Sequence, residues 1–243
     1  MVLQLAIALF LVFTIILQAG NFQTHTTAYF RIKYEKNVST EEIQKLGELM
    51  EAQYTEMRNN LNITLSHRID VFVFGSPRRF RSESKSKAFE DGDFQAGKIF
   101  LYFSRDLEKK QFLKSTISRV VSRSLLDEIH GCPEWLKEAY ALYLSNELDR
   151  FGQPARVTMR SFADLSEDYF KAERDAEVRE LYAKLSATAY FLVQHYGDHK
   201  VTEMFSMLKR GMSMEEAFET AFGESITEIE KAWVKALRMP ISK

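Results

Sequence analysis

The chain has 243 residues with 45% apolar and 13% aromatic side chains, which is enough for a hydrophobic core, so we do not expect disorder. Its 33 basic and 34 acidic residues leave a formal charge of −1, which excludes an overall field that attracts nucleic acid or an anionic membrane. Any binding must therefore use a local surface.

The N-terminal stretch is apolar over residues 5–17 and is followed by the small residues Ala19 and Gly20. A membrane span needs about 20 apolar residues, so this run resembles the core of a signal peptide more than a span. However, no Lys or Arg precedes the run, and the residues before the small pair form a poor cleavage site. We expect residues 1–20 to be a signal peptide or an N-terminal anchor. The protein is then exported to the periplasm or the exterior, or held on the membrane by residues 3–17.

Export predicts an oxidising compartment, but Cys132 is the only cysteine, so no disulfide can form within the chain. Cys132 lies between Gly131 and Pro133 in an expected turn. This setting is typical of a small packed residue and not of a nucleophile.

The first half of the chain predicts a small sheet with one helix. Alternating or β-branched and aromatic residues mark three strands, at residues 28–35, 68–75 and 98–103. A capping box of Ser39 and Glu42 precedes an apolar stripe at helical spacing over residues 43–57. We expect a long polar loop over residues 76–97 to join the second and third strands.

From about Leu113 onward the pattern is helical, with one Pro- and Gly-bearing interruption at residues 150–170. Two further capping boxes mark helix starts, Ser213 with Glu216 and Ser225 with Glu228. Strands followed by helices predict an α+β fold. We expect a single domain over residues 27–240.

Several motifs, in this order, resemble the peptidase MA-like domain of bacterial gluzincin metallopeptidases, the thermolysin-type zinc enzymes. Residues 132–145, CPEWLKEAYALYLS, resemble the Pro-x-Trp-Leu-x-Glu-Gly-x-Ala-Glu-Tyr helix of that family. Residues 185–237 resemble its closing helices, including the Tyr-Gly helix end and the tryptophan of the last helix. The resemblance implies a small N-terminal sheet with one helix, followed by a mostly helical C-terminal half.

In that family, a helix before the tryptophan carries His-Glu-x-x-His, whose two imidazoles share one helix face and bind Zn²⁺ while the Glu activates water. A third ligand is the Glu of the next helix. Aligned in this way, Ser118 and Ser122 stand at the two His positions, and Arg119 stands at the position of the catalytic Glu. Glu138 stands at the position of the third ligand. The resemblance therefore implies a degenerate site with no catalytic residue, metal or cofactor, and with Glu138 as its retained position.

Without zinc, Glu138 is a partly buried carboxylate that costs several kcal/mol unless it is paired or protonated. Arg119 lies where its guanidinium can reach this carboxylate. We predict that an Arg119–Glu138 ion pair replaces the metal as the clamp between the two helices. In the alternative, both side chains face solvent.

Three other groups of residues are candidates for chemistry. His130 with Glu138 and one of Asp127 or Glu128 is an alternative metal site, which implies an active zinc metallopeptidase. His195 and His199 have the i,i+4 spacing of metal ligands, but Gly197 between them is typical of a helix end. Ser118 and Ser122 have no base at a suitable spacing, so we interpret them as small residues at a helix contact.

The aromatic residues Trp135, Tyr140 and Tyr143 are expected in the core or in the wall of a cleft. A basic stretch precedes the third strand, with Arg78, Arg79, Arg81, Lys85 and Lys87. Acidic residues follow it closely, so it predicts a solvated edge or contact with a protein, and no nucleic acid.

We expect an exported, non-catalytic, peptidase-like domain that binds or scaffolds an unknown protein, or an extended peptide beside the third strand. Membrane contact is expected only through the N-terminal segment. One alternative is an active zinc enzyme built around His130 and Glu138. The other is a structural module of an envelope assembly.

Overall fold

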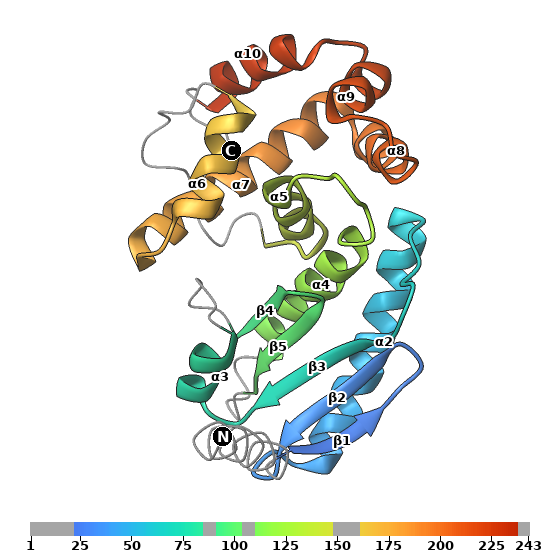
Figure 1. Cartoon of the computed structure of the whole chain (residues 1–243), viewed down its shortest axis with the longest axis vertical. Coiled ribbons are helices and arrows are strands. Elements are labelled where there is room, and N and C mark those ends of the chain that lie inside the picture. Colours follow the sequence, from blue (N-terminus) through green and yellow to red (C-terminus); the bar gives the residue numbers. More distant parts are fainter. Residues whose placement is uncertain (1–21, 85–90, 104–109, 148–160, 238–243) are drawn as a thin grey trace, which may run out of the picture.

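A computed structural model describes residues 22–84, 91–103, 110–147 and 161–237 of the chain (Figure 1). Within these residues the first half forms a mixed sheet with the strand order β1-β2-β3-β5-β4. The strands are β1 (Phe22–Thr26), β2 (Phe30–Glu35), β3 (Ile69–Phe74), β4 (Gly92–Gln95) and β5 (Lys98–Tyr102). The three inner strands are parallel, and the edge strands β1 and β4 pair antiparallel.

Two helices of the first half lie on different faces of the sheet. The long helix α2 (Thr40–Leu61) packs with α4 (Lys110–Leu126) on the face that carries the main core, which includes Val71 and Val73. The short helix α3 (Pro77–Ser84) packs Phe80 against Phe74, with ring centroids 6.4 Å apart. Because successive strand residues point to opposite faces, Phe74 and α3 lie on the other side of the sheet from Val73.

The second half is helical and lies beyond the end of the sheet (Figure 1). Its helices are α5 (Glu134–Leu144), α6 (Phe162–Lys171), α7 (Asp175–Tyr196), α8 (Asp198–Lys209), α9 (Met214–Phe222) and α10 (Ile226–Leu237). The core is continuous from the sheet to α10. The predicted α+β fold, with a small sheet and one long helix before a mostly helical half, is confirmed.

Local helix signals are confirmed as well. In all three predicted capping boxes, the glutamate accepts a hydrogen bond from the backbone N–H of the serine three residues before it. Gly197 ends α7 with φ of 88°. The expected interruption at residues 150–170 is wrong in its second part, because α6 begins at Phe162; residues 148–160 lie outside the described residues.

One expectation for the sheet needs correction, and two strands are added to it. The polar stretch at residues 76–97 is not a plain loop, because it holds α3 and β4. Both elements are short, and Phe80 and Ser84 are the only buried residues of α3, which leaves little periodic signal. β1, which begins at Phe22, adds an edge strand that the sequence patterns did not predict. The third predicted strand, β5, is an inner strand because β4 pairs on its outer side.

None of the helices in the described part of the chain combines the length and the apolar content that a membrane span requires. The apolar run at residues 5–17 lies outside that part.

Candidate functional site

Helix α4 lies between α2, β4 and α5, and this position buries most of its surface. Val120 and Val121 are fully buried, and the apolar residues of the helix point to more than one side. A helix that is apolar on most sides is buried as a whole. Arg119 and Arg123 are therefore carried into the interior, with 1% and 3% of their surface exposed.

Arg119 joins three separate parts of the chain. Its Nη1 donates to Oε1 of Glu138 in α5 at 2.9 Å, and its Nη2 donates to the carbonyl oxygen of Gly92 in β4 at 2.8 Å. Its Nε lies 3.0 Å from Oε2 of Glu147, in the turn after α5. The predicted Arg119–Glu138 contact is confirmed, and the guanidinium also ties the edge of the sheet to the helical half.

Arg123 holds the second oxygen of the same carboxylate. Its Nε lies 2.9 Å from Oε2 of Glu138, and its Nη2 donates to Oε2 of Glu134 at 2.7 Å. Lys137 pairs with Glu134 at 2.8 Å and with Asp127 at 3.2 Å. Glu138 is thus clamped between two arginines that are four residues apart on one helix.

Positive and negative charges are equal in number in this cluster. We call it the arginine–glutamate cluster: Arg119, Arg123, Lys137, Glu134, Glu138 and Glu147. It holds three positive and three negative groups, most of them buried. A buried ion is tolerated only when it is paired and hydrogen-bonded, and each of these groups has an opposite charge within 3.0 Å.

Burial alone lowers the pKa of Arg119 and of Arg123, but their acidic and phenolic neighbours outweigh it, so both pKa values lie above the ordinary range. Burial raises the pKa of Glu134, but Arg123 and Lys137 outweigh it and the pKa is lowered. Tyr182 of α7 donates to Oε1 of Glu138 at 3.2 Å. Arg119, Arg123 and Glu134 therefore carry their charges at neutral pH.

Asp93 in β4 lies at the edge of this cluster and is half-buried. Burial raises the pKa of its carboxyl, and the charge of Glu138 adds to the effect. An acid whose folded-state pKa is raised costs stability once the pH exceeds its unfolded value. We expect Asp93→Asn to increase the free energy of unfolding at pH 7 and to change it little below pH 3.8, the ordinary value. Urea titrations at the two pH values measure this difference; equal effects at both would contradict the assignment.

Gly92 allows β4 to approach α4 closely. A Cβ at this position would lie 2.5 Å from Cγ2 of Thr116 and 2.8 Å from Cδ2 of Leu101. Such overpacking costs about 1–3 kcal/mol, so we expect Gly92→Ala to lower the free energy of unfolding by that amount. Thr116→Ser removes the nearest methyl group, and chemical denaturation of the double variant should recover part of the loss. No recovery would mean that Thr116 is not the obstacle.

The comparison with known families bears on this helix pair. A family model described as the peptidase MA superfamily matches residues 109–239, more than half of the chain. The chain belongs to the peptidase MA superfamily. No curated protein matches it. The match covers α4 to α10 and confirms the resemblance carried by residues 132–145 and 185–237.

The superfamily resemblance implies a zinc ion, but the residues that face Glu138 do not fit one. Guanidinium groups stay protonated and offer no lone pair to a metal, and Arg119 and Arg123 stand on the facing side of α4. Each oxygen of Glu138 already lies 2.9 Å from a guanidinium nitrogen. Among the residues that the structure describes, no group of three or more His, Cys, Asp or Glu could hold a metal.

Sequence reasoning placed the five-residue motif at Ser118, Arg119 and Ser122 and missed Arg123. Ser118 and Ser122 are buried on α4, consistent with small residues at a helix contact. The pair at i,i+4 that faces Glu138 is instead Arg119 and Arg123. The available signal was two arginines four residues apart, among the apolar residues Ile117, Val120, Val121 and Leu125 of the same helix. Glu147 carried no such signal in the sequence, because only the turn after α5 brings its carboxylate to Arg119.

The alternative site around His130 is not assembled in the described residues. His130 is exposed between α4 and α5, whereas Glu138 is buried. Asp127 pairs with Lys137, and Glu128 accepts hydrogen bonds from the loop before β3. Nothing in these contacts directs the three acids to the imidazole.

The aromatic residues of α5 lie in the core and at its border. Trp135 stacks on Phe162 with centroids 5.0 Å apart, and the hydroxyl of Tyr140 donates to Oδ1 of Asp198 at 2.8 Å. Both are buried, so they are core residues and not walls of an open cleft. Tyr143 is half-buried and stacks on Tyr140.

Two further candidates have structural explanations. His195 lies in the last turn of α7 and stacks on Phe191, whereas His199 belongs to α8 beyond Gly197. The helix break between them means that the i,i+4 spacing does not bring the imidazoles together. Cys132 is 5% exposed, and burial raises the pKa of its thiol to about 12. The thiol is protonated at neutral pH, which agrees with a packed residue.

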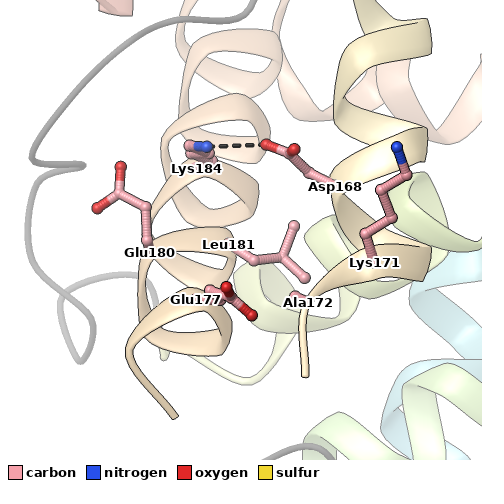
Figure 2. A pocket seen from close by; sticks show the side chains of 7 residues that line it. All are labelled: Asp168, Lys171, Ala172, Glu177, Glu180, Leu181 and Lys184. Carbon is pink, nitrogen blue, oxygen red and sulfur yellow. Dashed lines mark hydrogen bonds and ion pairs between the residues drawn. The ribbon is translucent and has the colours of Figure 1, made fainter. Parts of the chain in front are cut away.

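A pocket of about 220 Å³ opens between α6 and α7 (Figure 2). Leu181 and Ala172 form its apolar part, and Lys184 bridges the helices to Asp168 at 2.8 Å. The other charged residues that line it are Lys171, Glu177 and Glu180. Lys171 pairs with Glu167, and Glu177 with Arg174, so these charges are compensated within the chain.

Proposed function

We propose that this member of the peptidase MA superfamily is a non-catalytic, exported domain that binds or scaffolds another protein or an extended peptide. The observation that carries the proposal is the clamp on Glu138. Hydrolysis by a zinc enzyme needs a metal ion with an open coordination position and a base beside the metal-bound water. Here two guanidinium groups fill the space beside the retained carboxylate.

The same cluster has a structural task that explains why Glu138 is kept. Through Arg119 it connects β4, α5 and the turn after α5, and through Arg123 it connects α4 to the start of α5. In this proposal the charge network replaces the metal as the link between the sheet and the helical half. Activity is lost while the architecture is retained.

The contact at Gly92 bears on where an extended peptide could bind. The inner strand β5 is paired on both sides, so only the edge strands offer backbone groups. Directly before β4, the carbonyl of Asp91 accepts a hydrogen bond from the backbone N–H of Tyr102 in β5. By alternation the carbonyl of Gly92, the first residue of β4, points outward, and it accepts a hydrogen bond from Arg119. A peptide added to β4 could form backbone hydrogen bonds only past Gly92, because the carbonyl of Gly92 is already occupied by Arg119. We therefore favour a partner that contacts side chains.

The test is the zinc content of the purified full chain after zinc loading and desalting, because zinc sites of this class bind tightly. We expect less than about a tenth of an equivalent. About one equivalent that is lost in Glu138→Gln or His130→Asn would overturn the proposal in favour of the alternative enzyme, with a chelator-sensitive peptidase assay to follow. His199→Asn is the matched control, because this histidine lies outside both candidate sites.

The proposal also includes export through the apolar N-terminal residues. Residues 3–17 either direct secretion or remain as an anchor, and mass spectrometry of the protein isolated from membranes separates the two. The third reading, a structural module of an envelope assembly, predicts a stable protein partner without peptide affinity.

A further inference from the structure

Helix α3 carries a local positive charge on a nearly neutral chain. Its eight residues include three arginines and one glutamate, a charge of +2, whereas the whole chain has −1. Arg79 pairs with Glu35 and lies 3.9 Å from Glu83. Arg78 and Arg81 are exposed and form no ion pair within the described residues. They share one face of the helix, away from the buried Phe80.

The chain enters the domain directly beneath this helix. Phe22, the first residue of β1, packs edge-on against Phe72 and Phe74, with centroids 6.0 and 5.8 Å apart. The guanidinium of Arg79 lies over the ring of Phe22, at 5.6 Å. Figure 1 shows α3 and the start of β1 at the same end of the molecule, far from α9. The entry point of the chain is therefore fixed beside α3.

In the sequence, only a few residues separate the apolar run from this point. Residue 17 is five residues before Phe22, and an extended chain covers at most about 18 Å over that interval. If residues 3–17 stay in a membrane, the end of the domain that holds α3 must lie near the lipid headgroups. Exposed arginines near an anionic surface gain about 1 kcal/mol each, which is about a fivefold change in the docking equilibrium.

We propose that α3 docks on anionic lipid through Arg78 and Arg81 and orients the domain on the membrane that holds its N-terminal segment. This inference rests on the part of the proposed function in which residues 3–17 act as an anchor. It adds a second membrane contact to the N-terminal one. The opposite end of the molecule, with α8 and α9, then points away from the membrane.

The experiment uses the full chain with an environment-sensitive dye on Ser82→Cys, an exposed position of α3 beside the two arginines. Cys132 does not compete for the dye, because it is buried and its pKa is raised to about 12. The protein is reconstituted with vesicles of phosphatidylcholine alone, or with about a third phosphatidylglycerol. Flotation of the vesicles reports anchoring, and dye emission reports docking of α3. A dye on Thr220→Cys in α9 is the control position.

We expect flotation with both kinds of vesicle, and a blue shift at Ser82→Cys only with the anionic one. Arg78→Gln with Arg81→Gln should abolish the shift, as should about 1 M salt, where the Debye length is about 3 Å. Lys209→Gln with Arg210→Gln, at exposed positions of the distant end, should leave it unchanged.

The opposing outcomes are distinct. Flotation without a blue shift on anionic vesicles overturns the docking of α3 and leaves the anchor standing. A shift that also occurs on phosphatidylcholine, or that survives the loss of both arginines, overturns the electrostatic contact. Absence of flotation overturns the anchor and this inference with it, while the zinc measurement continues to test the loss of catalysis.

Discussion

Glu138→Ala is expected to lower the free energy of unfolding by about 3–5 kcal/mol, because removal of one partner from a buried charge network leaves the others uncompensated. Oε1 and Oε2 of Glu138 are each 2.9 Å from a guanidinium nitrogen. Without them, Arg119 keeps Glu147 and the carbonyl of Gly92, and Arg123 keeps Glu134. Urea denaturation followed by circular dichroism measures the loss.

Two comparisons interpret this result. Glu219→Ala on the exposed face of α9 should change the free energy of unfolding by less than about 0.5 kcal/mol. Replacement of the central charges together, with Arg119→Met, Arg123→Met, Glu138→Leu and Glu147→Leu, should recover most of the loss, since apolar groups of similar volume avoid desolvation. A loss below about 0.5 kcal/mol for Glu138→Ala would show that the carboxylate is not a clamp.

Trp233→Ala should lower the free energy of unfolding by a similar amount, about 3–5 kcal/mol, because it removes a large, fully buried side chain. Trp233 packs against Phe162 of α6 with centroids 4.9 Å apart, and its indole N–H donates to Oγ1 of Thr188 in α7 at 3.0 Å. The residue therefore fixes α10 on two other helices. Thermal and chemical unfolding measure the effect.

The matched variant is Trp233→Phe, which keeps an aromatic ring and loses the hydrogen bond and part of the volume. Trp233→Phe should lower the free energy of unfolding by less than Trp233→Ala does. Both should shift one cooperative transition, the same one that Glu138→Ala shifts, because the core is continuous from the sheet to α10. A separate transition for α10 would contradict the single domain expected over residues 27–240.

Features with a local physical cause were predictable. Each capping box needs only a serine and a glutamate three residues apart, and all three form as expected. Gly197 ends α7 because glycine accepts the positive φ of a helix end. The strands β2, β3 and β5 follow from alternating or β-branched residues. In contrast, β4 is four residues long and carries two acidic or amide side chains, so no periodicity reveals it.

At the site, the sequence supplied one residue pair and missed the rest of the network. The Arg119–Glu138 contact was predictable because Glu138 lacks the zinc ion of the family. The family resemblance also places the helix of Arg119 opposite the helix of Glu138. Glu147 and the carbonyl of Gly92 were not, because they come from a turn and an edge strand far away in the chain. Their approach depends on how α4 packs on β4, where the missing Cβ of Gly92 leaves room.

The sequence by itself determined the α+β architecture, the helix boundaries at capping residues and the superfamily resemblance, because these depend on periodicity, on contacts within one turn and on local motifs. Only the tertiary structure decided which charges meet in the interior, that β4 forms the edge of the sheet beside β5, and that the chain enters beside the arginines of α3. These features depend on contacts between distant segments, whose energies reside in packing and burial and leave no local pattern.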